Sequence, residues 1–185
     1  MATVPSQIVQ SVGGRVKAAD WNNELNALVA FYTNPPRALV YQDTTGTTVP
    51  DSTYTSITFN NEGSGYSSSM IGFDSDGMHS TVSNTSRFTA VTAGTYQFDG
   101  AICFVSNSTN SRAARWALNG SSFGPIVRIP AVSGAITVVT APTLFITMAV
   151  SDYVELQGWQ NSGGNLATSV ASPGYSYAQC SWVSS

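Results

Sequence analysis

Hydrophobic and polar residues alternate in short runs along most of the chain, from about residue 37 to its end. The clearest run extends from Tyr96 to Phe104, where Tyr96, Phe98, Ile102 and Phe104 fall on one face of an extended strand. Turns rich in Gly, Ser, Thr and Asn separate the runs. About nine or ten strands at this spacing, with no helix between them, predict an all-β antiparallel sandwich or barrel.

The other runs have the same strand-like composition, and one of them leads into a hairpin. We expect strands at residues 39–42, 54–59, 87–91, 114–118, 126–129, 136–140, 143–149, 153–160 and 177–183. Directly after the fourth of these runs come Asn119 and Gly120, the dipeptide that favours a two-residue hairpin turn.

The run from Tyr153 to Trp159 is apolar on both of its faces. Val154 and Leu156 point to one side, whereas Tyr153 and Trp159 point to the other. One side packs against the second sheet, so the other needs a different partner. Tyr153 and Trp159 are therefore candidates for a subunit interface, although aromatic residues in a sandwich are also ordinary core residues.

The first 36 residues form a separate predicted unit that precedes the strands. Residues 3–12 are typical of an extended arm, in which Val4 and Ile8 are spaced among polar residues and are candidate docking contacts. The predicted boundaries are residues 1–36 for the arm and a following helix, and residues 37–185 for the sandwich.

A helix is predicted from Ala18 to about Tyr32, because the apolar residues there recur with a 3.6-residue period. Pro35 and Pro36 prevent its continuation. The apolar stripe consists of Trp21, Leu25, Leu28, Val29 and Tyr32. A helix of ~15 residues is only marginally stable alone in water, so this stripe needs a partner. That partner is either the chain's own sandwich or the same helix in sister subunits.

Charged residues are unusually rare, at 9% of the chain against roughly 25% in a typical soluble domain. Lys17 is the only lysine, the net charge is −3, and the arginines are scattered along the sequence. This pattern predicts no basic patch and no nucleic-acid partner. No apolar run reaches the ~18 residues of a membrane span, and the N-terminal residues lack the features of a secretory signal.

The most concentrated polar cluster contains Asp74, Asp76 and His79, which surround Gly77. Carboxylates and an imidazole can hold a divalent cation such as calcium, which makes these three residues weak metal candidates. Two carboxylates could also serve a glycosidase. The simpler interpretation is a turn, in which the aspartates accept hydrogen bonds from nearby backbone amides and Gly77 supplies a positive φ angle.

Catalysis is poorly supported by the residues available, and we expect no catalytic site and no cofactor. His79 is the only histidine. Residues 120–124 match the Gly-x-Ser-x-Gly pattern, but this segment follows a hairpin turn and the histidine precedes it, whereas a nucleophile elbow needs a strand-to-helix turn and a later histidine.

Two cysteines, Cys103 and Cys180, lie within predicted strands far apart in the sequence. They could form a disulfide, or they could be two buried thiols that act as small hydrophobic side chains.

Four segments carry the motifs of one family. They are residues 94–100 (GTYQFDG), 115–120 (RWALNG), 148–156 (MAVSDYVEL) and 178–183 (AQCSWV). In this order and spacing they resemble the strands of C1q/TNF-like jelly-roll domains. The resemblance covers most of the chain from about Pro36 onward, and it implies a ten-stranded jelly roll that assembles as a homotrimer.

Further segments resemble phage proteins. Residues 73–79 (FDSDGMH) and 84–87 (NTSR) are similar to a phage-encoded branch of these domains, and residues 12–22 (VGGRVKAADWN) resemble the openings of phage tail and fibre subunits. This resemblance implies an N-terminal segment that attaches the protein to a larger particle. Vertebrate members follow a collagen stalk or a signal peptide, and neither is found in this sequence, so we expect a virion protein and not a secreted ligand.

The leading hypothesis is therefore a trimeric, non-enzymatic structural protein of a tailed bacteriophage virion, assembled in the host cytoplasm. It would lie on the tail tip or fibre as a minor tail protein, or on the capsid as a decoration or head fibre. Its partners would be its own copies and other virion proteins, which it contacts through the N-terminal arm. The alternative is an adhesin that binds host-surface glycans through residues 60–69 or the Asp74 cluster, with calcium. A depolymerase is a third hypothesis, but carboxylates are few.

Overall fold

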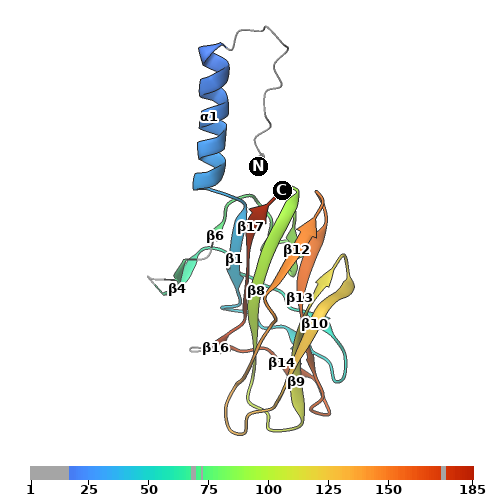
Figure 1. Ribbon diagram of the computed structural model, residues 1–185. Coiled ribbons are helices and arrows are strands. Elements are labelled where there is room, and N and C mark those ends of the chain that lie inside the picture. The colour runs from blue at the N-terminus through green and yellow to red at the C-terminus, as the bar shows by residue number, and fades with distance from the viewer. Residues whose placement is uncertain (1–16, 68–69, 72, 172–173) are drawn as a thin grey trace.

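The computed structural model shows a two-sheet sandwich with one helix standing above its end (Figure 1). It describes residues 17–67, 70–71, 73–171 and 174–185. The predicted arm with Val4 and Ile8 lies outside the described residues.

Helix α1 (Ala18–Thr33) occupies the segment that the apolar period predicted. It ends just before Pro35 and Pro36, because proline cannot continue a helix. In its last turn the Thr33 hydroxyl donates a hydrogen bond to the Val29 carbonyl at 2.8 Å. The same hydroxyl also lies 3.1 Å from the Ala30 carbonyl, which is one of the last four carbonyl groups of the helix.

The first sheet, as far as the described residues show, has six strands, and all of its pairs are antiparallel. Across the sheet its order is β11 (Thr137–Thr140), β8 (Gly94–Phe104), β17 (Tyr177–Ser184), β1 (Arg37–Tyr41) and β6 (Phe73–Asp74), and β12 (Leu144–Met148) also pairs with β8. The last strand of the chain, β17, thus lies between β8 and the first strand, β1 (Figure 1). This arrangement joins the beginning and the end of the predicted 37–185 segment in one sheet.

The second sheet has five strands in the described part of the chain, again with antiparallel pairs. Its order is β10 (Ser121–Pro130), β9 (Ser111–Leu118), β13 (Tyr153–Gln160) and β3 (Thr55–Ser56), and β7 (Arg87–Thr89) also pairs with β13. The hairpin between β9 and β10 is confirmed at Asn119 and Gly120, whose φ angles of 50° and 79° are the positive values that a type I′ turn needs.

Three short pairs connect or flank the two sheets. They are β2 (Thr48–Val49) with β14 (Leu166–Ala167), β4 (Ser64–Ser67) with β5 (Met70–Ile71), and β15 (Val170–Ala171) with β16 (Gly174–Tyr175). The strand predicted at residues 54–59 is only partly right, because regular pairing is limited to β3. Beyond it, the amide of Ile57 donates to the Leu156 carbonyl of β13, and the amide of Phe59 donates to the Thr85 carbonyl. The segment therefore bonds first to β13 and then to the residues before β7.

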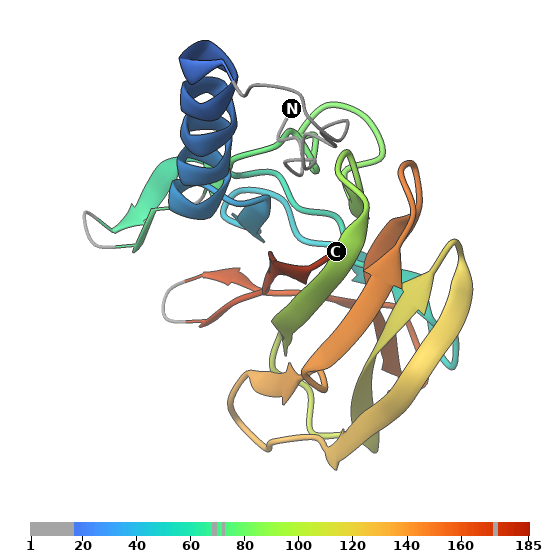
Figure 2. The same ribbon diagram turned by 45° about the horizontal axis from the view of Figure 1, so that its top comes forward.

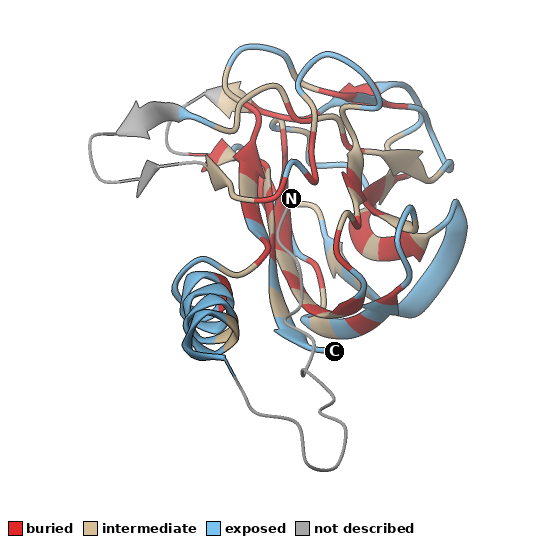
Figure 3. Ribbon diagram, turned by 90° about the horizontal axis from the view of Figure 1, so that it is seen from above, coloured by how far each residue is buried: buried red, intermediate tan, exposed pale blue. Residues whose placement is uncertain are grey.

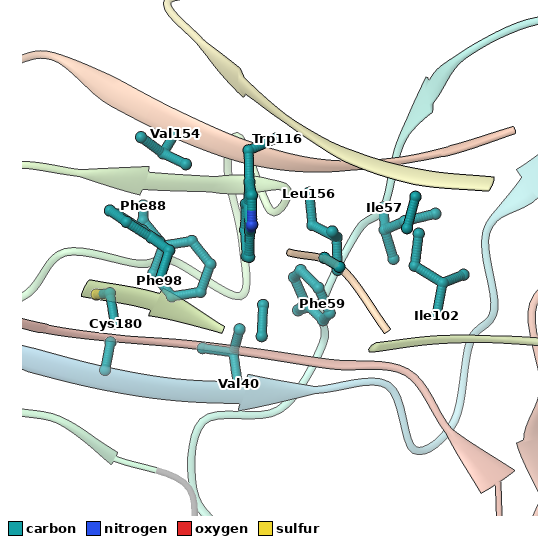
Figure 4. Packing of buried hydrophobic residues seen from close by; sticks show 14 of the residues in the cluster. Val40, Ile57, Phe59, Phe88, Phe98, Ile102, Trp116, Val154, Leu156 and Cys180 are labelled. Atoms are coloured by element: carbon teal, nitrogen blue, oxygen red, sulfur yellow. The ribbon is translucent and has the colours of Figure 1, made fainter. Parts of the chain in front are cut away.

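The hydrophobic core lies between the inner faces of the two sheets (Figure 4). The alternation along β8 is confirmed, since Tyr96, Phe98, Ile102 and Phe104 are all completely buried. Trp116 of the opposite sheet packs onto Phe98 with 5.4 Å between the ring centroids. Interlocking large side chains from both sheets therefore fix how the two sheets sit against each other.

Helix α1 is attached to the sandwich at its C-terminal end (Figures 1 and 2). Phe31 is its one buried residue, and the ring of Phe31 meets the ring of Trp182 edge-on at 4.8 Å between centroids. Viewed from above, most of the helix surface is exposed (Figure 3). The apolar stripe did not predict this contact, because Phe31 lies off the stripe.

Candidate interaction surfaces

Asp74 organises a turn at the end of strand β6. One carboxylate oxygen accepts a hydrogen bond from the amide of Asp76 at 3.2 Å, and the other accepts one from the amide of His79 at 2.8 Å. Gly77 has a φ angle of 69°, which glycine adopts without strain. These bonds are the ones that the turn interpretation of the cluster predicted.

The side chains of the other two metal candidates point to partners of their own. The Asp76 carboxylate accepts a hydrogen bond from the Thr92 hydroxyl at 2.8 Å. The two ring nitrogens of His79 lie 3.0 Å from a carboxylate oxygen of Glu62 and 3.0 Å from the Thr85 carbonyl oxygen. Within the described residues no three His, Cys, Asp or Glu side chains are placed to hold a metal ion. The side chains of the cluster therefore stabilise the turn and connect it to neighbouring segments.

The loop proposed for glycan binding, residues 60–69, is tied internally where the structure describes it. The side-chain amides of Asn60 and Asn61 both donate to the Asp43 carboxylate, and the Tyr41 hydroxyl donates to the Gly63 carbonyl at 2.8 Å. Ser68 and Ser69 lie outside the described residues. The side chains at the start of this loop thus hold the loop in place.

Cys103 and Cys180 are both buried and are not joined to each other. Burial raises the pKa of the Cys103 thiol from 9.0 to about 11 and raises the pKa of the Cys180 thiol as well. The Cys103 thiol donates to the Tyr175 carbonyl at 3.2 Å, and the Cys180 sulfur lies 3.8 Å from the Met78 sulfur. The second interpretation, two buried thiols, is the one that the structure shows.

Because burial raises the pKa of these thiols, we expect the protein to lose stability at alkaline pH. Above the ordinary thiol pKa of 9.0 the unfolded chain releases the Cys103 proton, whereas the folded chain keeps it up to about pH 11. Because the folded state then binds more protons, the free energy of unfolding should fall between about pH 9 and pH 11. Urea titrations across this range measure the fall, and Cys103→Ser should make it smaller. Rapid labelling of both thiols by a disulfide reagent at pH 7 would contradict their burial.

The apolar stripe of helix α1 is exposed along its whole length. The relative exposures are 60% for Trp21, 56% for Leu25, 42% for Leu28, 52% for Val29 and 71% for Tyr32. The chain's own sandwich therefore does not cover the stripe, which removes one of the two partners that the sequence left open. The other, a further copy of the helix, stays a prediction.

A second exposed apolar surface lies on the sandwich itself. The segment from β10 to β12 contributes Phe123, Ile126, Val132, Val138 and Phe145, all of them exposed large hydrophobic residues. Phe145 is the most open of these, at 60%, and it is paired with Gln97 on the outer face of the first sheet. The exposure of these residues was not predicted, because apolar character alone does not distinguish an edge strand from a core strand.

The two aromatic candidates of strand β13 lie on the outer face of the second sheet, as predicted, but each is covered by an arginine. The guanidinium carbon of Arg87 lies 3.9 Å from the Tyr153 ring centroid, and that of Arg128 lies 4.4 Å from the Trp159 ring centroid. Arg115 stacks in the same way on Tyr54, at 3.6 Å. The prediction that the arginines form no basic patch is therefore wrong for this face, because strand pairing gathers three of them.

Comparison with solved structures identifies the architecture. The globular domain of the zebrafish complement 1qA protein superposes with a TM-score of 0.55 and 13% sequence identity, over 80% of this chain and 97% of that one. Murine APRIL superposes with a TM-score of 0.55 and 8% identity, over 80% and 99% of the two chains. The sandwich is a C1q/TNF-like jelly roll.

A TNF from S. frugiperda, Eiger, is similar too, with a TM-score of 0.52, 9% identity and coverage of 80% and 92%. At these identities the likeness establishes the jelly-roll fold alone. No protein-family model and no curated protein matches the sequence. Among the described helical residues, none form a helix long and apolar enough to cross a membrane.

Proposed function

We propose that this chain is a non-enzymatic, homotrimeric structural protein of a bacteriophage virion. Residues 1–36 attach it to the particle and hold three copies together, while the jelly roll faces outward. A tail-tip or fibre subunit and a capsid decoration or head fibre both fit this role.

The exposed stripe of helix α1 carries the proposal. Trp21, Leu25, Leu28 and Tyr32 follow one another at spacings of four, three and four residues, which is the a/d repeat of helices that pack side by side in a coiled coil. All four side chains are more than two-fifths exposed in the single chain. A helix of this length gains most of its stability from tertiary packing. Packing against the same helix in other copies supplies this stability.

The sandwich offers a second surface for assembly. The exposed apolar residues Phe123 and Ile126 lie on β10, the edge strand of the second sheet, and Val138 and Phe145 lie on β11 and β12, which pair with β8 at the edge of the first sheet. β10 and β11 contact each other. An edge that packs on a neighbour's sheet makes a head-to-tail contact, and such contacts close into a ring when the rotation between copies allows it. A trimer with a threefold ring of sandwiches below a three-helix bundle uses both surfaces.

The virion assignment is supported by the N-terminal resemblance to phage tail and fibre subunits and by the composition. Only 9% of the residues are charged, so most of the surface is uncharged and rich in hydrogen-bonding groups. Such a surface suits close packing among copies and neighbouring proteins more than long-range electrostatic steering.

Sedimentation of the full chain tests the proposal. We expect a single species of three chains at micromolar concentration, since three copies of the helix bury their apolar stripes together. A monomer at that concentration would contradict the trimer. Imaging of phage particles that carry a tagged chain then tests attachment, and a particle population that lacks the tag would contradict the virion role.

A second function, glycan binding by an adhesin, is not favoured by the loop at residues 60–69 or by the Asp74 cluster, because their polar side chains bond to one another or to nearby backbone. The outer face of the second sheet, where the three arginines gather, favours it instead.

A further inference from the structure

Three arginines lie in a row on the outer face of the second sheet. Val154 and Leu156 of strand β13 are buried in the core, so the alternate residues Glu155, Gln157 and Trp159 face outward. In the strand register Glu155 is opposite Arg87 and Gln157 is opposite Arg115. Trp159 and Arg128 are both opposite Ala113, on its two sides. Along β13 the register of the three arginines spans five residues, roughly 13 Å at the usual rise of a strand. Across the sheet the row runs from β7 to β10.

The three guanidinium groups are held in the same manner. Each stacks on a ring, as described for Tyr153, Tyr54 and Trp159, and each uses its Nε atom within the chain. We call the three arginines and these three rings the arginine strip. Stacking on an aromatic ring and a fixed Nε bond orient a guanidinium before any ligand arrives, which lowers the entropy lost on binding.

Two of the Nε contacts are hydrogen bonds, and the third is an ion pair. Arg115 Nε donates to the Gln157 side-chain oxygen at 2.9 Å, and Arg128 Nε donates to the Ser111 hydroxyl at 2.7 Å. Arg87 Nε lies 3.5 Å from a carboxylate oxygen of Glu155. For the terminal nitrogens of these three arginines, no hydrogen bond to another described residue is found. Those nitrogens form the edge with which arginine binds a planar anion through two parallel bonds.

The charge on this face is positive, although the chain as a whole is acidic. Among the described residues, the one carboxylate that forms an ion pair with these three guanidinium groups is that of Glu155, which is buried and accepts a hydrogen bond from the Ser86 hydroxyl at 2.6 Å. The whole chain carries a net charge of −3. An anionic partner is therefore attracted to this face more than to the rest of the surface.

We propose that the arginine strip binds an acidic polysaccharide, whose carboxylate groups recur along an extended chain. The three cations lie on β7, β9 and β10 and cross the outer face of the sheet diagonally, which suits an extended polymer better than a compact ligand. Carboxylates match the terminal edges of the guanidinium groups. A guanidinium already lies over each ring, so the strip lacks the open ring faces on which single-stranded nucleic acids stack.

The strip is complete within one chain, so binding does not depend on the proposed trimer. In a trimer three strips on one particle would raise the apparent affinity for a polymer through multivalency. Binding and assembly can therefore fail independently, and each has its own measurement.

Binding of the full chain to immobilised polygalacturonate, alginate and hyaluronan tests this proposal, with dextran as the neutral polymer and single-stranded DNA as a competing polyanion. We expect binding to at least one acidic polysaccharide, no binding to dextran, and an affinity that falls as salt is raised. Arg115→Ala and Arg128→Ala should each weaken the binding roughly tenfold, as expected when a charge-assisted pair is lost. Arg115→Lys should recover only part of it, because lysine lacks the planar fork.

Arg37→Ala is the matched control. Arg37 also stacks on a ring, with 4.9 Å between its guanidinium carbon and the Phe73 centroid, but it belongs to the first sheet, so its loss should leave binding unchanged. Absence of binding to all three acidic polymers, or equal binding to DNA, would overturn the proposal. So would an Arg115→Ala variant that keeps its affinity, or one that sediments as a monomer, since the latter would assign the strip to a subunit contact.

Discussion

Replacing Trp116 by alanine should lower the free energy of unfolding by about 3–5 kcal/mol, the range for removing a buried large aromatic side chain. Trp116 is completely buried between the sheets, and its indole N–H donates to the Pro142 carbonyl at 2.8 Å. The substitution removes the packing onto Phe98 and leaves that carbonyl without its partner. Urea titration at a fixed protein concentration measures the change.

Trp116→Phe separates the two contributions and covers the case in which the alanine variant does not fold. Phenylalanine fills most of the space, so the expected loss is smaller, about 1–2 kcal/mol, and comes mainly from the lost hydrogen bond and the remaining gap. Val82→Ala serves as a surface control, because Val82 is 90% exposed. Equal losses for Trp116→Ala and Val82→Ala would contradict the central place of Trp116 in the core.

The double change Leu25→Asp and Leu28→Asp should convert the trimer into monomers while the sandwich stays folded. Both leucines lie on the exposed stripe of helix α1, and in the proposed bundle each would bury an aspartate against apolar neighbours. Each buried leucine contributes roughly 1.5–3 kcal/mol, so the loss in all copies is expected to weaken association by at least about 100-fold. Sedimentation measures the mass, and circular dichroism follows the β-sandwich.

Asn23→Asp is the control for this experiment. It adds a charge to the same helix, but Asn23 lies on the face opposite the stripe, so the trimer should persist. If Asn23→Asp dissociated the trimer as completely as the double variant, the contact between the helices would not run along the stripe. If the double variant remained a trimer, the sandwich surfaces would carry the assembly and the role of the helix would be wrong.

Local sequence was sufficient to predict the helix and the longer strands, but not the short strands such as β2, β6 and β14. Along β8 the alternation of Tyr96, Phe98 and Ile102 with polar residues allowed one assignment, since a strand has a side-chain period of two and one face must be buried. The helix was equally clear, because its period differs and two prolines end it. The hairpin at Asn119 and Gly120 followed from the positive φ angles that this turn requires.

The Asp74 cluster shows why a site was harder to predict than the fold. A turn and a cation site would use the same residues in the same order. They differ in where the side chains of Asp76 and His79 point, and these are held by Thr92, Glu62 and Thr85, which come from other segments. No spacing within the cluster contains that information.

The sequence by itself determined the all-β sandwich, the helix and the unusually low charge, because each depends on residues close together in the chain. The tertiary structure alone decided which apolar residues stay exposed and where the arginines meet. Arg87, Arg115 and Arg128 look scattered in the sequence, yet they share one face because three different strands carry them to strand β13 or its neighbour β9 in a fixed register. Register depends on the burial of the opposite faces of those strands, which is a property of the whole sandwich.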